Sequence, residues 1–206
     1  MTVGGRSLAA GLLLPYVAVG IGWTWLHSGL AALLLYQAGI VLLAGRQLPT
    51  RFRSLFQGAG GRLVWVFAPL VLLVAFGFLR VLPMLLVPGL DPAAWLVSYG
   101  LTGGTLLFVA FQFGIVHPFL EEVHYQPLRQ RAPLLAHLSY AVYHGMVLWG
   151  CFRDWVVAIT VVSLIGTSVL FYVFERGRFG SRLSLAVHAM ADLLVAGVAL
   201  YWAGWF

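Results

Sequence analysis

Residues 155–174 read WVVAITVVSLIGTSVLFYVF, a run of 20 residues without a charged side chain. A helix rises about 1.5 Å per residue, so this run can cross a hydrocarbon core roughly 30 Å thick. Backbone groups in lipid must satisfy their hydrogen bonds within the protein, which favours a helix. The stretch therefore predicts a membrane-spanning helix, and the rest of the chain repeats the pattern.

Six further apolar stretches predict six further spans. They cover about residues 7–26, 29–44, 63–86, 94–129, 132–152 and 183–205. The stretch at 94–129 is too long for one straight crossing, and we expect Pro118 to kink or divide it. The longest loop, residues 45–62, carries four arginines and a Gly-Ala-Gly-Gly cluster. The expected fold is all-α, a polytopic bundle of about seven transmembrane helices.

The composition agrees with a chain surrounded by lipid. Of the 206 residues, 62% are hydrophobic and only 9% are charged, whereas about a quarter of a typical soluble domain is charged. We expect a single domain over residues 1–206 with no separate soluble module. The net charge of +6 comes from arginines in short loops, so we expect no nucleic-acid partner. Cys151 is the only cysteine, which excludes an internal disulfide.

The arginines predict how the chain lies in the membrane. With seven spans, one side holds Arg6, Arg46, Arg51, Arg53, Arg62, Arg129, Arg131, Arg176, Arg178 and Arg182, which are ten of the twelve basic residues. The other side holds Arg153, with Arg80 near the end of its span. The positive-inside rule then predicts a cytoplasmic N-terminus and an external C-terminus. The lysine-free composition indicates a GC-rich coding sequence, hence a bacterial inner-membrane protein.

Adjacent carboxylates, Glu121 and Glu122, are the strongest chemical signal. Ionisable groups inside a span are costly and usually face the bundle interior. Neighbouring helical residues point about 100° apart, so we expect one carboxylate to face a reaction centre while the other bonds to the scaffold. The alternative is a solvated pair at the membrane interface, because Pro127 and Arg129 follow closely.

Two later spans carry polar pairs at i and i+4, Tyr140 with His144 and His188 with Asp192. From their depth, we expect the Glu pair and these histidines to share a cavity open toward the cytoplasm. A carboxylate base, two histidines and an acid suit water activation and oxyanion stabilisation. The alternatives are histidines that only hydrogen-bond between helices, or a self-satisfied His–Asp pair.

A divalent metal such as zinc is equally compatible with these residue types, although no cofactor is firmly implied. Its ligands would be Glu121, His144 and His188, with an open fourth position. His117 and His124, at i−4 and i+3 from Glu121, would enlarge such a site. Satisfied interfacial histidines are the favoured interpretation of this second pair.

The ordered residues resemble the CPBP intramembrane proteases, which include the type II CAAX prenyl endopeptidases. That family carries Glu-Glu-x-x-x-Arg, then Phe-x-x-x-His, then His-x-x-x-Asn or Asp. Glu121-Glu122, His144 and the pair His188 and Asp192 match in order and spacing, within a core at about residues 94–204. Gln126 replaces the arginine, with Arg129 one turn away as a candidate substitute, and Tyr140 replaces the phenylalanine.

The resemblance implies a role for each matched residue. Glu121 would activate water with help from His144, His188 and Asp192 would stabilise the oxyanion, and Glu122 would hold the site together. The expected activity is endopeptidase cleavage of a membrane-anchored or lipidated polypeptide, such as a C-terminal sorting tail, near the membrane surface. The alternatives are a catalytically silent relative with an assembly or immunity role, and a membrane metal enzyme or transporter.

Overall fold

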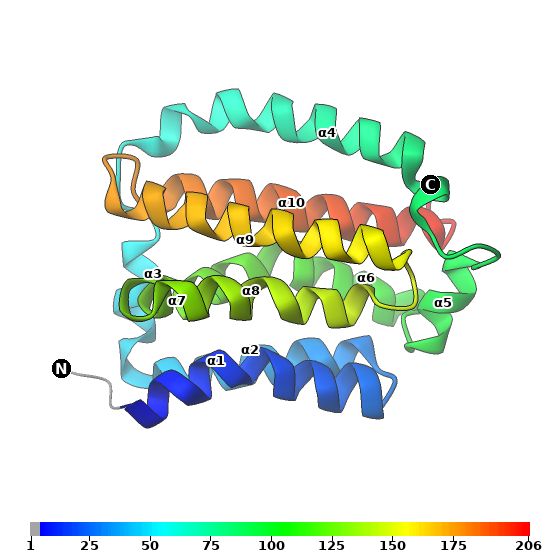
Figure 1. The fold of residues 1–206 in the computed structure, drawn as a ribbon, viewed down its shortest axis with the longest axis horizontal. Coiled ribbons are helices and arrows are strands. Elements are labelled where there is room, and N and C mark those ends of the chain that lie inside the picture. The colour runs from blue at the N-terminus through cyan, green and yellow to red at the C-terminus, as the bar shows by residue number, and fades with distance from the viewer. Residues whose placement is uncertain (1–4) are drawn as a thin grey trace.

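A computed structural model describes residues 5–206, which form an all-α fold (Figure 1). Outside the described part of the chain lie residues 1–4 of the expected single domain. The same holds for the side chains of Arg6 and Arg62. The helices are α1 (Gly5–Val19), η1 (Gly20–Trp25), α2 (Gly29–Ala44), η2 (Gly45–Gln47), α3 (Leu48–Ser54), η3 (Gly60–Arg62), α4 (Val64–Leu85), α5 (Pro92–Ser98), α6 (Gly103–Phe111), η4 (Gln112–Val116), α7 (His117–Arg131), α8 (Pro133–Leu148), α9 (Asp154–Arg176) and α10 (Ser181–Trp202).

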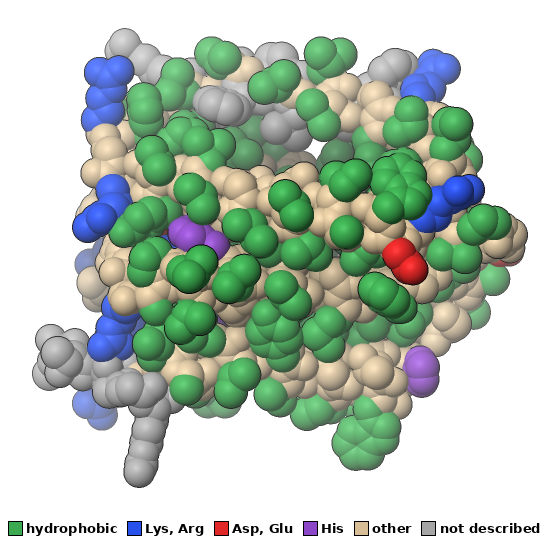
Figure 2. All heavy atoms as spheres, in the orientation of Figure 1, with side chains coloured by type: hydrophobic (Ala, Val, Ile, Leu, Met, Phe, Trp, Pro, Cys, Tyr) green, Lys and Arg blue, Asp and Glu red, His purple; other side chains and the backbone are tan. Residues whose placement is uncertain are grey.

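Long apolar helices confirm that the chain is built as an integral membrane protein. Five continuous helical stretches within the described residues are long and apolar enough to cross a bilayer. They are Ser7–Trp25, Gly29–Ser54, Gly103–Arg131, Asp154–Arg176 and Ser181–Trp202. Figure 2 shows the surface of such a bundle: arginine side chains gather at both ends of this face, and the band between them is largely hydrophobic.

The helices run side by side in layers (Figure 1). The α1–α2 hairpin packs against α8 and α7, α8 packs against α9, and α4 packs against α10. This order places α7 at the centre, where it contacts α2, α8, α9 and α10. Helix α7 also contacts α1 and α3, so its residues meet six other helices.

Local sequence signals explain several helix boundaries. The Ser28 side chain caps α2 by accepting a hydrogen bond from the Ala31 N–H at 3.2 Å, and the Asp91 side chain caps α5 in the same way. Pro133 begins α8, and Ala132 before it leaves the helical region, because a residue before proline disfavours helical backbone. Capping and proline chemistry thus set these ends.

The stretch at residues 94–129 is interrupted at a different point from the one predicted. The helix breaks at residues 99–102, between α5 and α6, where Gly100 and Gly103 take the positive φ that favours glycine. Pro118 lies in the first turn of α7. The π-helical turn η4 directly before it accommodates the missing proline N–H, so the helix continues from α6 through α7.

The predicted loop at 45–62 is a partly helical strap that contains α3. Its backbone hydrogen-bonds to the turn after α9: the Ala59 N–H donates to the Arg178 carbonyl at 3.1 Å, and the Gly60 N–H donates to the Phe179 carbonyl at 3.0 Å. Leu55 is completely buried against Val123 and Leu185. We call residues 45–62 the strap, and it closes the arginine-rich end of α7 and α10.

Candidate functional site

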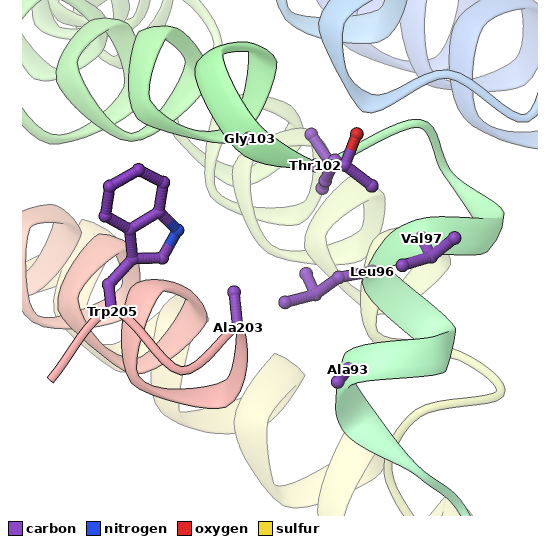
Figure 3. A pocket seen from close by; sticks show the side chains of 8 residues that line it. Ala93, Leu96, Val97, Thr102, Gly103, Ala203 and Trp205 are labelled. Carbon is purple, nitrogen blue, oxygen red and sulfur yellow. The ribbon is translucent and has the colours of Figure 1, made fainter.

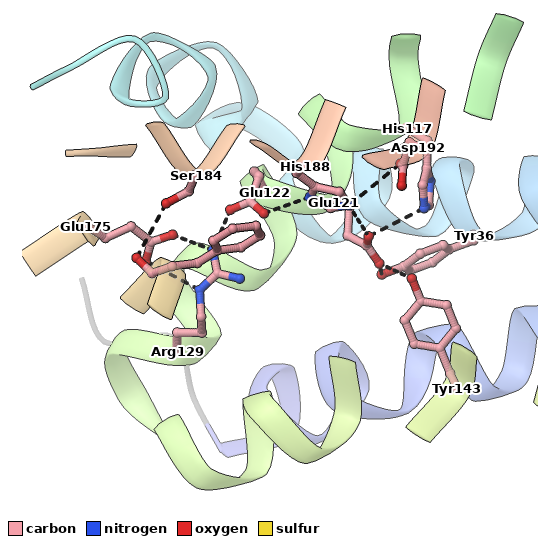
Figure 4. A network of polar contacts seen from close by, with 11 residues as sticks. Tyr36, His117, Glu121, Glu122, Arg129, Tyr143, Glu175, Ser184, His188 and Asp192 are labelled. Atoms are coloured by element: carbon pink, nitrogen blue, oxygen red, sulfur yellow. Dashed lines mark hydrogen bonds and ion pairs between the residues drawn. The ribbon is translucent and has the colours of Figure 1, made fainter. Parts of the chain in front are cut away.

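Both carboxylates of the predicted pair lie on α7 in the interior of the bundle. Glu121 is 0% exposed and Glu122 is 1% exposed, which excludes the alternative of a solvated pair at the interface. Side chains from α2, α8, α9 and α10 surround them (Figure 4). The bundle therefore builds a buried polar cluster around the two residues.

The two oxygens of Glu121 have different surroundings. Oε1 accepts hydrogen bonds from the Tyr36 hydroxyl at 3.0 Å and from the Tyr143 hydroxyl. Oε2 lies 3.1 Å from His188 Nε2 and 3.5 Å from His117 Nε2. No contact of Oε2 with the described side chains has hydrogen-bond geometry, so this oxygen is the one open to a further donor.

Glu122 lies in an ionic chain that extends toward α9. Its Oε1 lies 2.8 Å from His188 Nδ1, and its Oε2 accepts a hydrogen bond of 2.5 Å from Arg129. Arg129 also binds Glu175, through Nε at 3.3 Å and through a second guanidinium nitrogen. This two-point contact matches the planar fork of a guanidinium to a carboxylate.

His188 connects the two glutamates, and Glu122 is in addition bonded to Arg129. Nε2 of His188 faces Glu121 and its Nδ1 faces Glu122. The rotation between neighbouring helical residues is the reason, because it aims the two carboxylates at opposite nitrogens of a ring inserted from α10. The Nδ1 contact with Glu122 has hydrogen-bond geometry, whereas Nε2 lies close to Glu121 Oε2 without it.

Asp192 lies beside His188 on the same face of α10, as the i and i+4 spacing predicts. Its Oδ2 is 3.6 Å from His188 Nε2. Asp192 Oδ2 and His117 Nδ1 are buried and have no hydrogen-bond partner among the described residues. Because unpaired buried polar atoms are costly, each of these atoms, like Glu121 Oε2, can bond to a further polar partner.

His144 occupies a different position from the one expected. Its Nδ1 bonds to the Tyr140 carbonyl of its own helix at 2.6 Å, and its ring lies 4.1 Å from the Tyr143 ring. None of its hydrogen bonds within the described residues reaches Glu121 or His188. The spacing correctly predicted that Tyr140 and His144 share a helical face. The His144 ring, however, bonds to the backbone of its own helix.

The remaining histidines divide into two kinds. His117 is buried against Glu121, so the favoured interfacial interpretation was wrong for this residue. His124 is also buried, and its Nε2 bonds to the Gly11 carbonyl of α1 at 2.9 Å. His137 bonds to Ser168 of α9 at 2.9 Å. His124 and His137 thus join helices, whereas His117 belongs to the cluster.

Gln126, at the position of the motif arginine, has a separate role in this chain. Its side chain donates to Ser181 Oγ at 2.6 Å and accepts from Ser54 Oγ at 3.1 Å. It therefore joins α3 in the strap to the beginning of α10. Arg129 pairs with Glu122 instead, as the one-turn displacement allows.

Several cluster residues were missed by sequence reasoning, namely Tyr36, Tyr143 and Glu175. Glu175 ends an apolar span, and a lone acid there could have been matched to a buried arginine. Tyr36 on α2 carried no signal, because tyrosines are common in membrane helices and its partner lies 85 positions away.

The three residues expected to bind a metal, if one is present, do not point toward a common position. His144 points to its own backbone, and Glu121 contacts His188 directly. Within the described residues, no group of three or more His, Cys, Asp or Glu side chains is arranged to hold a metal ion. Glu121, His144 and His188 therefore do not form a metal-binding group in this conformation.

A small cavity lies elsewhere, between α5, the start of α6 and the end of the chain (Figure 3). Its volume is about 170 Å³. Its lining is Ala93, Leu96, Val97, Leu101, Thr102, Gly103, Ala203 and Trp205. The lining contains no acid or histidine, so the cavity offers none of the chemistry of the cluster.

Comparisons with known proteins add no assignment: no family model matches the chain, and neither a curated protein nor a solved structure matches it. The chemistry of the cluster therefore rests on its own geometry. One buried carboxylate oxygen faces two imidazoles, and a second acid lies 3.6 Å from one of them, an arrangement that can accept and return a proton.

Proposed function

We propose that this protein is an intramembrane endopeptidase of the CPBP kind, acting on a membrane-anchored polypeptide. Glu121 Oε2 accepts a proton from water, and the resulting hydroxide attacks the peptide carbonyl carbon. His188 stabilises the oxyanion as a hydrogen-bond donor, and Asp192 does so in its protonated form, because an ionised carboxylate only accepts hydrogen bonds. The carbon–nitrogen bond then breaks, and the proton returns from Glu121 to the leaving amine.

The observation that carries the proposal is the environment of Glu121 Oε2. This oxygen is buried, lies 3.1 Å from His188 Nε2 and 3.5 Å from His117 Nε2, and has no hydrogen-bond partner among the described groups. A general base needs such an available oxygen close to groups that stabilise developing charge.

Arg129 supports the proposal at the point where the motif departs from the family pattern. It supplies the positive charge for Glu122, and Glu122 in turn holds His188. His144 stays in the proposal through its contact with Tyr143, because catalytic hydrogen bonds often tighten only when substrate is bound.

The test uses the full chain reconstituted into phosphatidylethanolamine and phosphatidylglycerol vesicles. Single-span peptides with randomised residues on the arginine-rich side are added, and cleavage sites are found by mass spectrometry. We expect the wild type to cleave near the membrane surface, and Glu121→Gln and His188→Gln to lose roughly 100-fold or more of the rate.

His137→Gln is the matched control, because His137 is buried and bonded to Ser168 outside the cluster. It should retain the wild-type rate. Cleavage by Glu121→Gln at the wild-type rate, equal loss in His137→Gln and His188→Gln, or no cleavage by the wild type would each reject the proposal.

A catalytically silent CPBP-like membrane protein with an assembly or immunity role is the second candidate. The complete burial of Glu121 and Glu122 favours it, since a polar core that only joins helices needs the same enclosure. In that case Glu121→Gln lowers the thermal stability, and no variant changes a cleavage rate because there is none.

The membrane topology that we propose has seven crossings, with a cytoplasmic N-terminus and an external C-terminus in a bacterial inner membrane. It adds two helices to the five long ones, α4 with 22 residues and α8 with 16 residues. The distribution of arginines between alternate loops supports this count.

A further inference from the structure

Tyr36 and Tyr143 hold the same oxygen of Glu121, although they come from α2 and α8. A carboxylate has about four lone-pair sites, two on each oxygen. The two hydroxyls therefore occupy the sites of Oε1. The sites of Oε2 stay available on the side of His117 and His188.

Tyr36 is itself held firmly in place. It is 3% exposed, and its ring packs edge-on against His117, His124 and Tyr143, with ring centres 5.5, 5.9 and 5.6 Å apart. A terminal carboxylate torsion is broad, so an unrestrained glutamate can turn its free oxygen away from His117 and His188. A donor fixed by packing restrains that rotation.

We infer that Tyr36 and Tyr143 are positioning residues that select Oε2 of Glu121 as the atom that accepts the proton of water. This inference rests on the proposed function and extends it to α2, a helix outside the residues that resemble the protease family. Neither tyrosine touches the reacting atoms. Each acts by holding the base in one orientation.

The first measurement needs no substrate. Infrared difference spectra identify the carboxylate bands of Glu121 as those lost in Glu121→Gln. We expect Tyr36→Phe to shift these bands, because a hydroxyl donor is removed from Oε1. Tyr16→Phe is the matched control: the Tyr16 hydroxyl donates to the Ser139 carbonyl at 3.3 Å, away from Glu121, and its loss should leave the bands in place.

The second measurement is kinetic and uses a peptide cleaved by the wild type in the vesicle assay. We expect Tyr36→Phe to lower kcat roughly 10-fold or more while KM stays within about twofold, the size expected for one hydrogen bond to a charged group. Tyr16→Phe should change neither constant. If Tyr36 had only a structural role, Tyr36→Phe would lower the amount of folded protein, and the kcat of the folded enzyme would stay unchanged.

The outcomes separate the two proposals. Unshifted bands in Tyr36→Phe overturn the inference, as does an unchanged kcat in Tyr36→Phe when Glu121→Gln is inactive. In the second case the proposed function stands. If Glu121→Gln keeps the wild-type rate, or the wild type cleaves no peptide, the proposed function and the positioning role fall together, even where the infrared shift proves the hydrogen bond.

Discussion

Arg129 is completely buried and forms ion pairs with two carboxylates, Glu122 and Glu175. A buried arginine in a membrane bundle is stable only when its charge is paired. Glu122 could be anticipated as a partner, because it lies seven residues earlier on the same helix. Glu175 could not, since it reaches the site from α9 through packing that no local spacing encodes.

Replacing Arg129 with methionine should destabilise the protein strongly. The change leaves Glu122 and Glu175 as two buried acids without their cation, and breaking a buried ion pair on one side costs about 3–5 kcal/mol. Arg153→Met is the control, because the Arg153 side chain donates a hydrogen bond through Nε to the Leu86 carbonyl at 3.1 Å and lies outside the ionic chain. Its loss should cost about 1 kcal/mol. Equal stability of the two variants would contradict the account of the ionic chain.

Cys151 supplies the measurement for these variants. It is buried, and burial raises the pKa of its thiol to about 12, so the thiol is protonated and unreactive near neutral pH. A fluorescent maleimide should therefore label Cys151 only when the protein unfolds. Labelling against temperature then reports the stability of each variant.

At the scale of single elements, the sequence predicts apolar helices better than their interruptions. The spans at α9 and α10 needed only hydropathy, because lipid allows few alternatives to a helix. The break at residues 99–102 was missed since Pro118 was the more obvious breaker, although Gly100 and Gly103 were visible signals. The helix α3 in the strap was also missed, because the arginines and glycines of residues 45–62 favoured the prediction of a loop.

Gln126 should control how tightly the strap is held. In Gln126→Leu, the side-chain hydrogen bonds of residue 126 to Ser54 and to Ser181 are both lost. We expect faster amide hydrogen exchange in α3, measured by mass spectrometry, and unchanged exchange in α8. Gln47→Leu is the control, because Gln47 bonds only to Arg51 within the strap among the described contacts. Equal exchange in α3 for the two variants would show that Gln126 does not join the strap to α10.

For the whole molecule, the opposite ends of the bundle differ in charge. The described chain begins at one end and finishes at the other (Figure 1). The turn at residues 177–180 lies beside the strap, on the end with most arginines. The proposed seven crossings agree with both observations, as any odd number does, because an odd number places the two termini on opposite sides.

Reporter fusions check this topology. Alkaline phosphatase folds only outside the cytoplasm, so we expect it to be active when fused after Phe206 and inactive when inserted at residues 177–180. A green fluorescent protein at the same positions should give the opposite pattern. Activity at both positions, or the reversed pattern, would be inconsistent with a cytoplasmic arginine-rich end.

The most direct measurement of the central claim is hydrolysis in heavy-oxygen water. If Glu121 activates water inside the bundle, the wild type places one solvent oxygen in the new carboxyl terminus of the cleaved peptide, and Glu121→Gln gives no product above background. A product without solvent oxygen, or labelled product from Glu121→Gln at the wild-type rate, would contradict this mechanism.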